Sequence, residues 1–176
     1  NNTSPENLEL LTSHVVAALA TIEHNRAVDP LRLGLWGLSQ AGWIAPLVAK
    51  EYPDLAFMVM VSGPTVSVGA EHYYSDISGD SNLWARAEVM GAKADVLVDA
   101  RLPSLFDPLP LLQELSIPGL WIYGGLDGSI PVRKNIKQLE TLQALGKPYE
   151  ILLYPKGIHV LVETSFPYDF SQGFQD

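Results

Sequence analysis

The first regularity along the chain is a helical spacing of apolar residues near its start. Leu8, Leu11, Val15, Leu19 and Ile22 recur at steps of three and four, which is the spacing of one buried helix face. Just before this stretch, Ser4 is a residue type that caps helices, and Pro5 is a residue type that is favoured in the first helical turn. The pattern therefore predicts a helix over residues 4–25.

Four continuous apolar runs follow, and each has the length of a strand. They occupy residues 31–36, 55–61, 118–123 and 149–154. Runs without alternation are typical of strands buried on both faces, as in a parallel sheet. Helical patterns over residues 40–50 and 132–145 lie between runs and make strand–helix–strand units. We therefore expect one α/β domain over residues 1–176, with a mostly parallel sheet and flanking helices.

Residues 65–112 interrupt this alternation. Roughly fifty residues is longer than an ordinary connection between two core strands. A helical pattern spans residues 82–101, and the loop expected after it contains Pro103, Pro108 and Pro110. We interpret residues 65–112 as a helical cap inserted over the end of the sheet. His72, Tyr73 and Tyr74 either line a substrate pocket beneath this cap or simply pack it.

The stretch over residues 31–47 has the layout of strand, tight turn and helix, with Ser39 at the turn. This layout is typical of a nucleophile elbow, in which a serine takes a strained backbone conformation at the tip of a strand. Small residues must flank the serine because strand and helix pass close together there. Gly37 precedes it, and Ala41 stands where the common pattern has glycine. The alternative interpretation is a turn in which the serine only caps the helix.

Two further polar residues come directly after buried runs. Asp127 lies in the glycine-rich stretch 124–128 after the third run, and His159 follows the fourth. Because the carboxyl ends of parallel strands meet at one edge of a sheet, Ser39, Asp127 and His159 can converge there. The alternative for Asp127 is an ordinary turn aspartate.

These residue types suit acyl transfer. A serine hydroxyl is a weak nucleophile until a base removes its proton, and His159 would be that base. Asp127 would hold the imidazole tautomer and stabilise the imidazolium, so we predict a catalytic triad. The backbone N–H of Gln40 would donate to the oxyanion that forms. The predicted oxyanion and substrate-binding residues are Gln40, Trp43, His72 and Tyr73.

The chain resembles the α/β-hydrolase superfamily, and most of all the serine esterases related to dienelactone hydrolases and to the catalytic domain of prolyl oligopeptidases. The resemblance rests on the residues of the elbow at 37–43, the loop at 124–131 and the stretch at 157–159, in that order. It implies an α/β-hydrolase fold and the hydrolysis of a small-molecule carboxylic ester through an acyl-serine intermediate.

The resemblance is incomplete at the start of the chain. The family has further strands ahead of the elbow, whereas one helix precedes it here, and the loop that carries the family's second oxyanion donor is missing with those strands. The chain thus resembles the C-terminal part of a larger hydrolase: a proteolytic product, a truncated gene or one piece of a two-chain assembly. The sheet edge at residues 31–35 would be apolar and unpaired. We therefore expect self-association or pairing with a missing N-terminal part.

Composition narrows the range of partners. The 176 residues include 20 acidic and 11 basic side chains, for a net charge of −9. Such a surface repels phosphate backbones and anionic lipids, so neither nucleic acid nor a membrane is expected as a partner. Cysteine is absent, which excludes thiolate chemistry but identifies no compartment. No metal-ligand cluster or dinucleotide fingerprint is present in the sequence, so no cofactor is expected.

Three functions remain open at this point. The first is the hydrolysis of carboxylic esters, with thioesters and small amides as variants. The second is a non-catalytic hydrolase fragment that acts as a binding or assembly module. The third is an acyltransferase, which would share the acyl-serine intermediate and differ in excluding water.

Overall fold

The computed structural model of the chain describes residues 2–78, 105–163 and 169–170. Its main sheet has four parallel strands in the order β1-β2-β3-β4. They are β1 (Gly34–Leu38), β2 (Phe57–Val61), β3 (Gly119–Gly124) and β4 (Tyr149–Tyr154). A second, antiparallel pair is formed by β5 (Val162–Glu163) and β6 (Asp169–Phe170). The predicted α/β class with a parallel sheet is confirmed.

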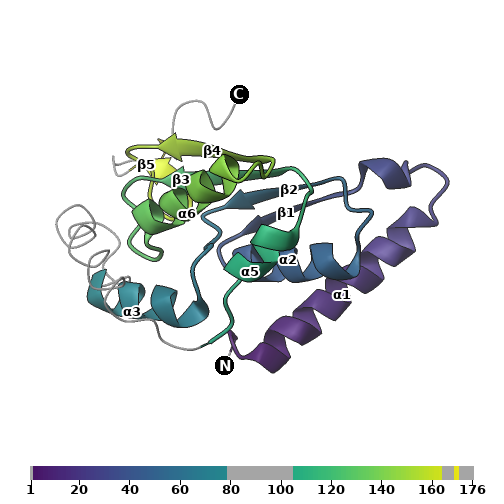
Figure 1. Ribbon diagram of the computed structural model, residues 1–176, viewed down its shortest axis with the longest axis horizontal. Helices are drawn as coiled ribbons and strands as arrows, with labels where there is room; N and C mark the ends of the chain where they lie inside the picture. The colour runs from purple at the N-terminus through teal and green to yellow at the C-terminus, as the bar shows by residue number, and fades with distance from the viewer. Residues whose placement is uncertain (1, 79–104, 164–168, 171–176) are drawn as a thin grey trace.

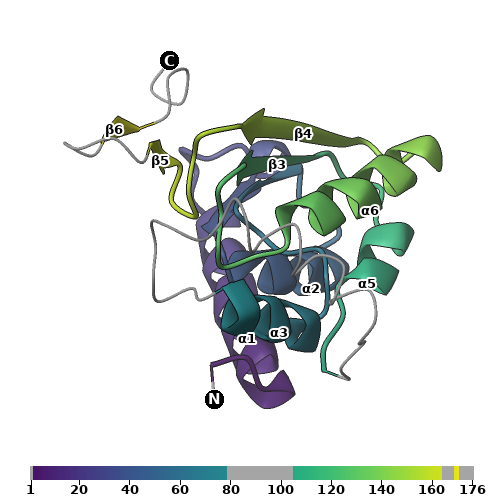
Figure 2. The same ribbon diagram turned by 90° about the vertical axis from the view of Figure 1, so that its left-hand side faces the viewer.

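Helices precede the first strand or lie between successive strands along the chain. They are α1 (Pro5–Glu23), the 3-10 helix η1 (Pro30–Arg32), α2 (Ala41–Glu51), α3 (Val68–Ser78), α5 (Leu109–Glu114) and α6 (Val132–Ala144). Ser4 caps α1 by accepting a hydrogen bond from the backbone N–H of Asn7, as the Ser-Pro pair predicts. Figures 1 and 2 show α2, α5 and α6 against one face of the sheet, with α1 packed on α2.

Backbone hydrogen bonds continue the strand ladder beyond the carboxyl ends of the strands. The N–H of Ser39 donates to the carbonyl of Val61 at 2.9 Å, and the N–H of Ser62 donates to the carbonyl of Ile122 at 2.8 Å. All four strands run in the same direction, and α3 lies at the edge where they end (Figure 1). Residues that follow the strands are therefore brought together at this edge.

The main core lies between the sheet and the helices. The sheet contributes the buried side chains of Met58, Met60, Trp121, Tyr123 and Tyr149. The helices contribute buried Leu19, Ala45, Val48, Ala49, Leu112, Leu139 and Leu142. Trp121 and Tyr149 meet edge to face, with ring centroids 5.0 Å apart. Burial raises the pKa of the Tyr149 phenol to about 12.

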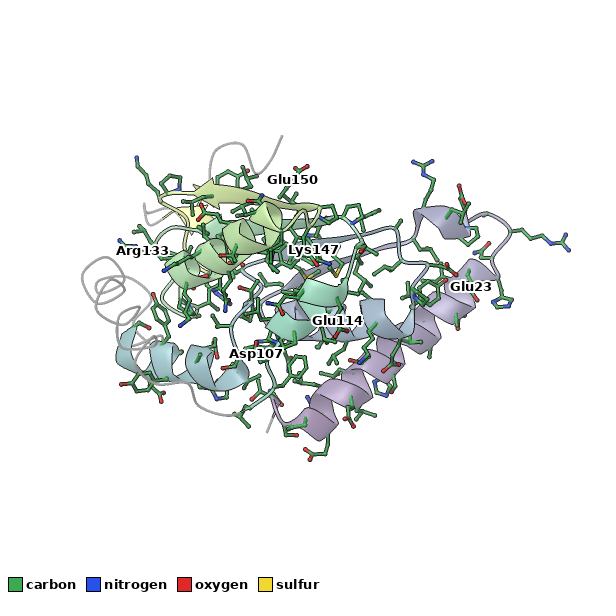
Figure 3. The ribbon with its side chains drawn as sticks, in the orientation of Figure 1. Glu23, Asp107, Glu114, Arg133, Lys147 and Glu150 are labelled. Carbon is green, nitrogen blue, oxygen red and sulfur yellow. The ribbon has the colours of Figure 1, made fainter. Side chains whose placement is uncertain are left out.

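The opposite face of the sheet is only partly buried. Near the carboxyl ends a small cluster joins Val61, Ile122 and Leu161, but Trp36 is 67% exposed and Phe57 is 42% exposed. Glu150 also lies on this face and points away from the helices (Figure 3). The prediction that the strands are buried on both faces therefore holds for β3 but is wrong for the outer strands β1 and β4. The apolar runs arise because both faces carry apolar side chains, although the helices among the described residues cover only one of them.

Two predictions near the start of the chain are also corrected. The strand expected from Leu31 begins at Gly34, because Asp29 turns the chain by accepting a hydrogen bond from the N–H of Leu31 at 3.0 Å. Ile22, expected on the buried face of α1, is 43% exposed. In this last turn the contact to the end of α2 is made by Glu23 instead, whose carboxylate accepts a hydrogen bond from the Tyr52 hydroxyl.

A helix replaces the loop that the prolines predict near residue 110. Pro110 lies in the first turn of α5, where a helix does not need the missing N–H. Leu112 in this helix is fully buried in the main core. The expected end of the cap, at Leu112, thus falls inside a helix that packs with α2 and α6. The helix expected over residues 82–101 lies outside the described residues.

Charged side chains are spread over several elements of the molecule. Those labelled in Figure 3 are Glu23, Asp107, Glu114, Arg133, Lys147 and Glu150. Within the described ranges, no helix combines the length and the apolar composition that a membrane crossing requires.

Because the main core lies on one face of the sheet, replacing a tryptophan on that face should destabilise the fold far more than replacing one on the other face. In the 176-residue chain, Trp121→Ala should lower the free energy of unfolding by about 3–5 kcal/mol, because it removes a fully buried ring. Trp36→Ala should change it by no more than about 0.5 kcal/mol, because that ring is mostly solvated. Urea denaturation followed by circular dichroism measures both. Equal costs would contradict the one-sided burial.

Candidate active site

Ser39 directly follows β1 and has a left-handed backbone, with φ of 54°. A non-glycine residue is strained in this region and stays there only where its surroundings hold it. Two hydrogen bonds do so: Ser39 N–H donates to the carbonyl of Val61, and Gly42 N–H donates to the carbonyl of Ser39, each at 2.9 Å. The residue therefore ends the strand and begins α2 in a single turn, which is the geometry expected of an elbow.

Glycines at two positions of the elbow allow close backbone packing around β1 and α2. A Cβ at Gly37 would lie 2.3 Å from the Cβ of Ala41. Alanine is therefore tolerated in the usual glycine position because Gly37, opposite, has no side chain. A Cβ at Gly42 would lie 2.6 Å from the backbone of Gly63 and Pro64. Gly42 thus allows the first turn of α2 to pack directly on the loop after β2.

The N-terminus of α2 lies beside Ser39. Gln40 is its N-cap residue, but the side chain makes no capping bond and its Nε2 donates to the carbonyl of Asn2 instead. No hydrogen bond within the described part of the chain uses the backbone N–H of Gln40. The first N–H groups of a helix carry partial positive charge. Gln40 therefore offers a donor to a negative charge that develops next to Ser39.

Ser39 lines a cavity of about 450 Å³ at the carboxyl edge of the sheet. The lining residues are Asn2, Thr3, Ser39, Gln40, Trp43, Pro64, Glu71, His72, Ser75, Asp76 and Ile130. Among these residues, Glu71, Ser75 and Asp76 are not singled out by any motif in the sequence. Their signal is the four-residue spacing of 71 with 75 and 72 with 76, which places each pair on the same side of a helix.

The other predicted binding residues have distinct environments. Trp43 is 3% exposed, and its Nε1–H donates to the carbonyl of Val66 at 2.9 Å, which fixes the indole between α2 and the segment before α3. His72 lines the cavity, and its Nε2 lies 3.3 Å from the hydroxyl oxygen of Thr3. Tyr73 instead packs against the cluster of Val66, Ala70 and Tyr74.

Asp127 is held in the loop after β3 by its own carboxylate. Its side chain is fully buried. Oδ1 accepts hydrogen bonds from the N–H of Ser129 at 2.8 Å and of Ile130 at 3.2 Å. The imidazole of His159, whose side chain is 17% exposed, places Nδ1 at 3.0 Å from Oδ1 and 2.9 Å from Oδ2. The structure therefore brings Asp127 and His159 together, as the sequence predicts.

Two glycines make this meeting sterically feasible. A Cβ at Gly124 would lie 2.4 Å from the carbonyl oxygens of Gly157 and Ile158. One at Gly125 would lie 2.5 Å from the carbonyl oxygen of Pro155. The Gly124-Gly125 pair therefore lets the loop that carries Asp127 run directly against the loop that carries His159. A hydrogen bond from Leu126 N–H to the Gly157 carbonyl, at 2.9 Å, joins the two loops.

Within the described residues, no three His, Cys, Asp or Glu side chains gather in a way that could hold a metal ion.

Comparison of the sequence with known families gives a match over nearly all of the chain. Residues 11–172 match the prolyl oligopeptidase family. This chain belongs to the prolyl oligopeptidase family. It is thus a member of a hydrolase family, and the resemblance found in the sequence is confirmed.

Individual relatives support the same assignment. The acylamino-acid-releasing enzyme of Sus scrofa is 25% identical over 145 residues, which cover 80% of this chain and 19% of that protein. A protein of Methylorubrum extorquens, provisionally named a carboxymethylenebutenolidase, is 27% identical over 84% of this chain and 40% of its own length. Pyrococcus horikoshii acylaminoacyl peptidase has a similar structure, with a TM-score of 0.60 at 19% identity, over 84% of this chain and 23% of that one. This member of the prolyl oligopeptidase family therefore has the α/β-hydrolase fold. The chain spans less than half the length of each of these three relatives.

The close contact between the loops after β3 and β4 predicts that two glycine-to-alanine substitutions in the first of these loops differ in their effect on stability. Gly124→Ala should lower the free energy of unfolding by about 1–3 kcal/mol, because the new methyl group meets two carbonyl oxygens. Gly128→Ala, whose Cβ would have nothing within 4 Å, should change it by no more than about 0.5 kcal/mol. Chemical denaturation of both variants measures the difference. A destabilising Gly128→Ala alongside a neutral Gly124→Ala would contradict the described packing.

Proposed function

We propose that this chain carries the catalytic residues of a serine hydrolase that cleaves carboxylic esters through an acyl-serine intermediate. Ser39 is the nucleophile, His159 the general base and Asp127 the carboxylate that orients the base. The observation that carries the proposal is the contact between fully buried Asp127 and partly buried His159, with Nδ1 to Oδ2 at 2.9 Å, at the sheet edge where strained Ser39 lines a cavity.

The orientation of His159 suits this role. Because Nδ1 faces the carboxylate, its proton is held there, and Nε2 is the nitrogen that accepts the proton of the attacking serine. The tautomer follows from the acceptor-only character of an ionised carboxylate. As the imidazole takes up the proton, the buried charge of Asp127 stabilises the imidazolium.

The reaction then divides into two steps with one tetrahedral intermediate each. Ser39 Oγ attacks the ester carbonyl carbon while its proton moves to His159 Nε2, and the carbonyl oxygen becomes an oxyanion that accepts from Gln40 N–H. When the intermediate collapses, the C–O bond to the alcohol breaks and Nε2 returns the proton to the leaving oxygen. Water repeats the sequence on the acyl-serine, which releases the acid and restores Ser39.

The release of N-acylated amino acids is a second candidate, favoured by the several relatives named acylamino-acid-releasing enzymes. It uses the same acyl-serine chemistry on an amide bond. A 4-nitrophenyl ester and an N-acyl amino acid anilide with the same acyl group separate the two. Turnover of the ester alone supports the esterase, and anilide turnover at a comparable kcat/KM supports the second candidate.

Covalent labelling with a fluorophosphonate, a probe that traps activated serines, tests the nucleophile. We expect one adduct per chain by intact mass, and none in Ser39→Ala. Ser62→Ala is the matched control, because Ser62 also has a left-handed backbone directly after a strand but is fully buried. It should label like the unchanged protein. Absence of labelling in folded protein would contradict catalysis and favour the non-catalytic binding module.

Asp127→Asn should slow labelling on the order of 10³–10⁴-fold, because the amide no longer favours the tautomer with a proton on Nδ1. Asp107→Asn is the matched control. The Asp107 carboxylate also accepts a backbone N–H bond, from Leu109 at 3.0 Å, but it is not part of the site. Second-order labelling rates of the two variants give the comparison, and similar rates would exclude the proposed role of Asp127.

A further inference from the structure

Helix α3 presents two adjacent sides to different neighbours. One side carries the cavity-lining residues Glu71, His72, Ser75 and Asp76. The other carries Tyr74 and Ser78, which are four residues apart and each 3% exposed. Residues at this spacing lie one helical turn apart on the same side of a helix. Both hydroxyls contact the loop at residues 124–131, which we call the acid loop because it carries Asp127.

The two hydroxyls act on consecutive carbonyl groups of the acid loop. Tyr74 donates from its phenol to the backbone carbonyl of Asp127 at 3.2 Å. The Ser78 hydroxyl donates to the carbonyl of Gly128. Asp127 is therefore held at two places: its carboxylate by Ser129, Ile130 and His159, and its backbone carbonyl by α3.

The segment that leads into α3 is tied to the other end of the acid loop. Asn135, fully buried in α6, accepts hydrogen bonds at Oδ1 from the N–H groups of Thr65 at 2.7 Å and Val66 at 3.2 Å. Its Nδ2 donates to the carbonyl of Pro131 at 3.0 Å. One side chain thus connects the start of the α3 segment to the end of the acid loop. The position of α3 is set relative to this loop from both sides.

We propose that Tyr74 and Ser78 are positioning residues, whose hydroxyls hold the Asp127–Gly128 backbone so that the carboxylate stays on Nδ1 of His159. The proposal rests on the proposed serine hydrolase function. Rotation of the Asp127–Gly128 peptide group would move the carboxylate relative to the imidazole. A misplacement of about 1 Å in a catalytic site can cost on the order of a hundredfold in rate. Helix α3 is thus part of the catalytic apparatus as well as a wall of the cavity.

A matched pair of tyrosine substitutions tests this role. Tyr74→Phe and Tyr149→Phe each remove one hydroxyl that donates to a backbone carbonyl from a residue 3% exposed. Tyr149 donates to Leu112 at 2.7 Å, at the start of β4 and so at the opposite end of the sheet from the site. Both variants should lose thermal stability to a similar degree. The carbonyl that loses its donor belongs to Asp127 in the first variant and to Leu112 in the second.

Steady-state kinetics with a 4-nitrophenyl ester, together with fluorophosphonate labelling, should separate the variants. Tyr74→Phe should lower kcat and the labelling rate about tenfold with KM changed by less than about twofold, because substrate contacts remain and only the base is misplaced. Tyr149→Phe should keep kcat within about twofold. Ser78→Ala provides a second, smaller change at the same loop, and the double variant Tyr74→Phe/Ser78→Ala should be slower than either single one.

A spectroscopic readout does not depend on activity. The proton shared between His159 Nδ1 and Asp127 gives a far-downfield proton NMR signal, assigned by its loss in Asp127→Asn. Tyr74→Phe should broaden or shift this signal and speed its exchange with water, whereas Tyr149→Phe should leave it unchanged.

The outcomes distinguish the two proposals. If the unchanged protein labels and Tyr74→Phe matches Tyr149→Phe in kcat and in NMR signal, the positioning role is overturned and the hydrolase function stands. If the unchanged protein fails to label, the proposed function fails, and an unperturbed signal in Tyr74→Phe would overturn the positioning role as well.

Discussion

Close backbone contact between the two loops that follow β3 and β4 is the constraint on which the candidate site depends. Parallel pairing of β3 with β4 already places the ends of the two strands side by side. A side chain at Gly124 or Gly125 would nevertheless collide with carbonyl oxygens of the neighbouring loop. With no Cβ there, the Asp127 carboxylate can be fully buried and still reach Nδ1 of His159. Burial is acceptable for this charge because three donors, the N–H groups of Ser129 and Ile130 and Nδ1 of His159, contact its oxygens.

Glycines also allow close backbone contact at the elbow around Ser39. The strained backbone of Ser39 is held by a hydrogen bond to β2 and by the first turn of α2. That turn can lie close to β1 and to the loop after β2 only because positions 37 and 42 are glycines. Strain at Ser39 is therefore supported by regular secondary structure on both sides. This arrangement fits a serine that must keep a fixed orientation toward a base on a different loop.

The side chains of the main core and the residues of the candidate site lie in different parts of the molecule. Helices α1, α2, α5 and α6 pack on one face of the sheet and bury the large side chains of the main core. The carboxyl edge is left for Ser39, Asp127 and His159, with α3 placed over it (Figure 1). Because α3 both lines the cavity and contacts the acid loop, changes in this helix affect substrate contacts and the Asp127–His159 pair together. In this chain, Tyr74 and Ser78 thus connect the cavity wall to the acid loop.

Much of this organisation is already determined by the sequence. The runs at 55–61, 118–123 and 149–154 are long, apolar and bounded by turn residues, so each becomes a strand close to its expected limits. The position of Asp127 and His159 after neighbouring parallel strands is sufficient to predict that these two side chains meet, because parallel strands end at one edge. Only the tertiary structure decides burial on the second face, where Trp36 and Phe57 are exposed, since an apolar run cannot show which of its faces a helix will cover. The tertiary structure also decides the contacts of Tyr74, Ser78 and Asn135 with the acid loop. These contacts join residues fifty or more positions apart or bury a polar side chain in a helix, and no local spacing in the sequence encodes either.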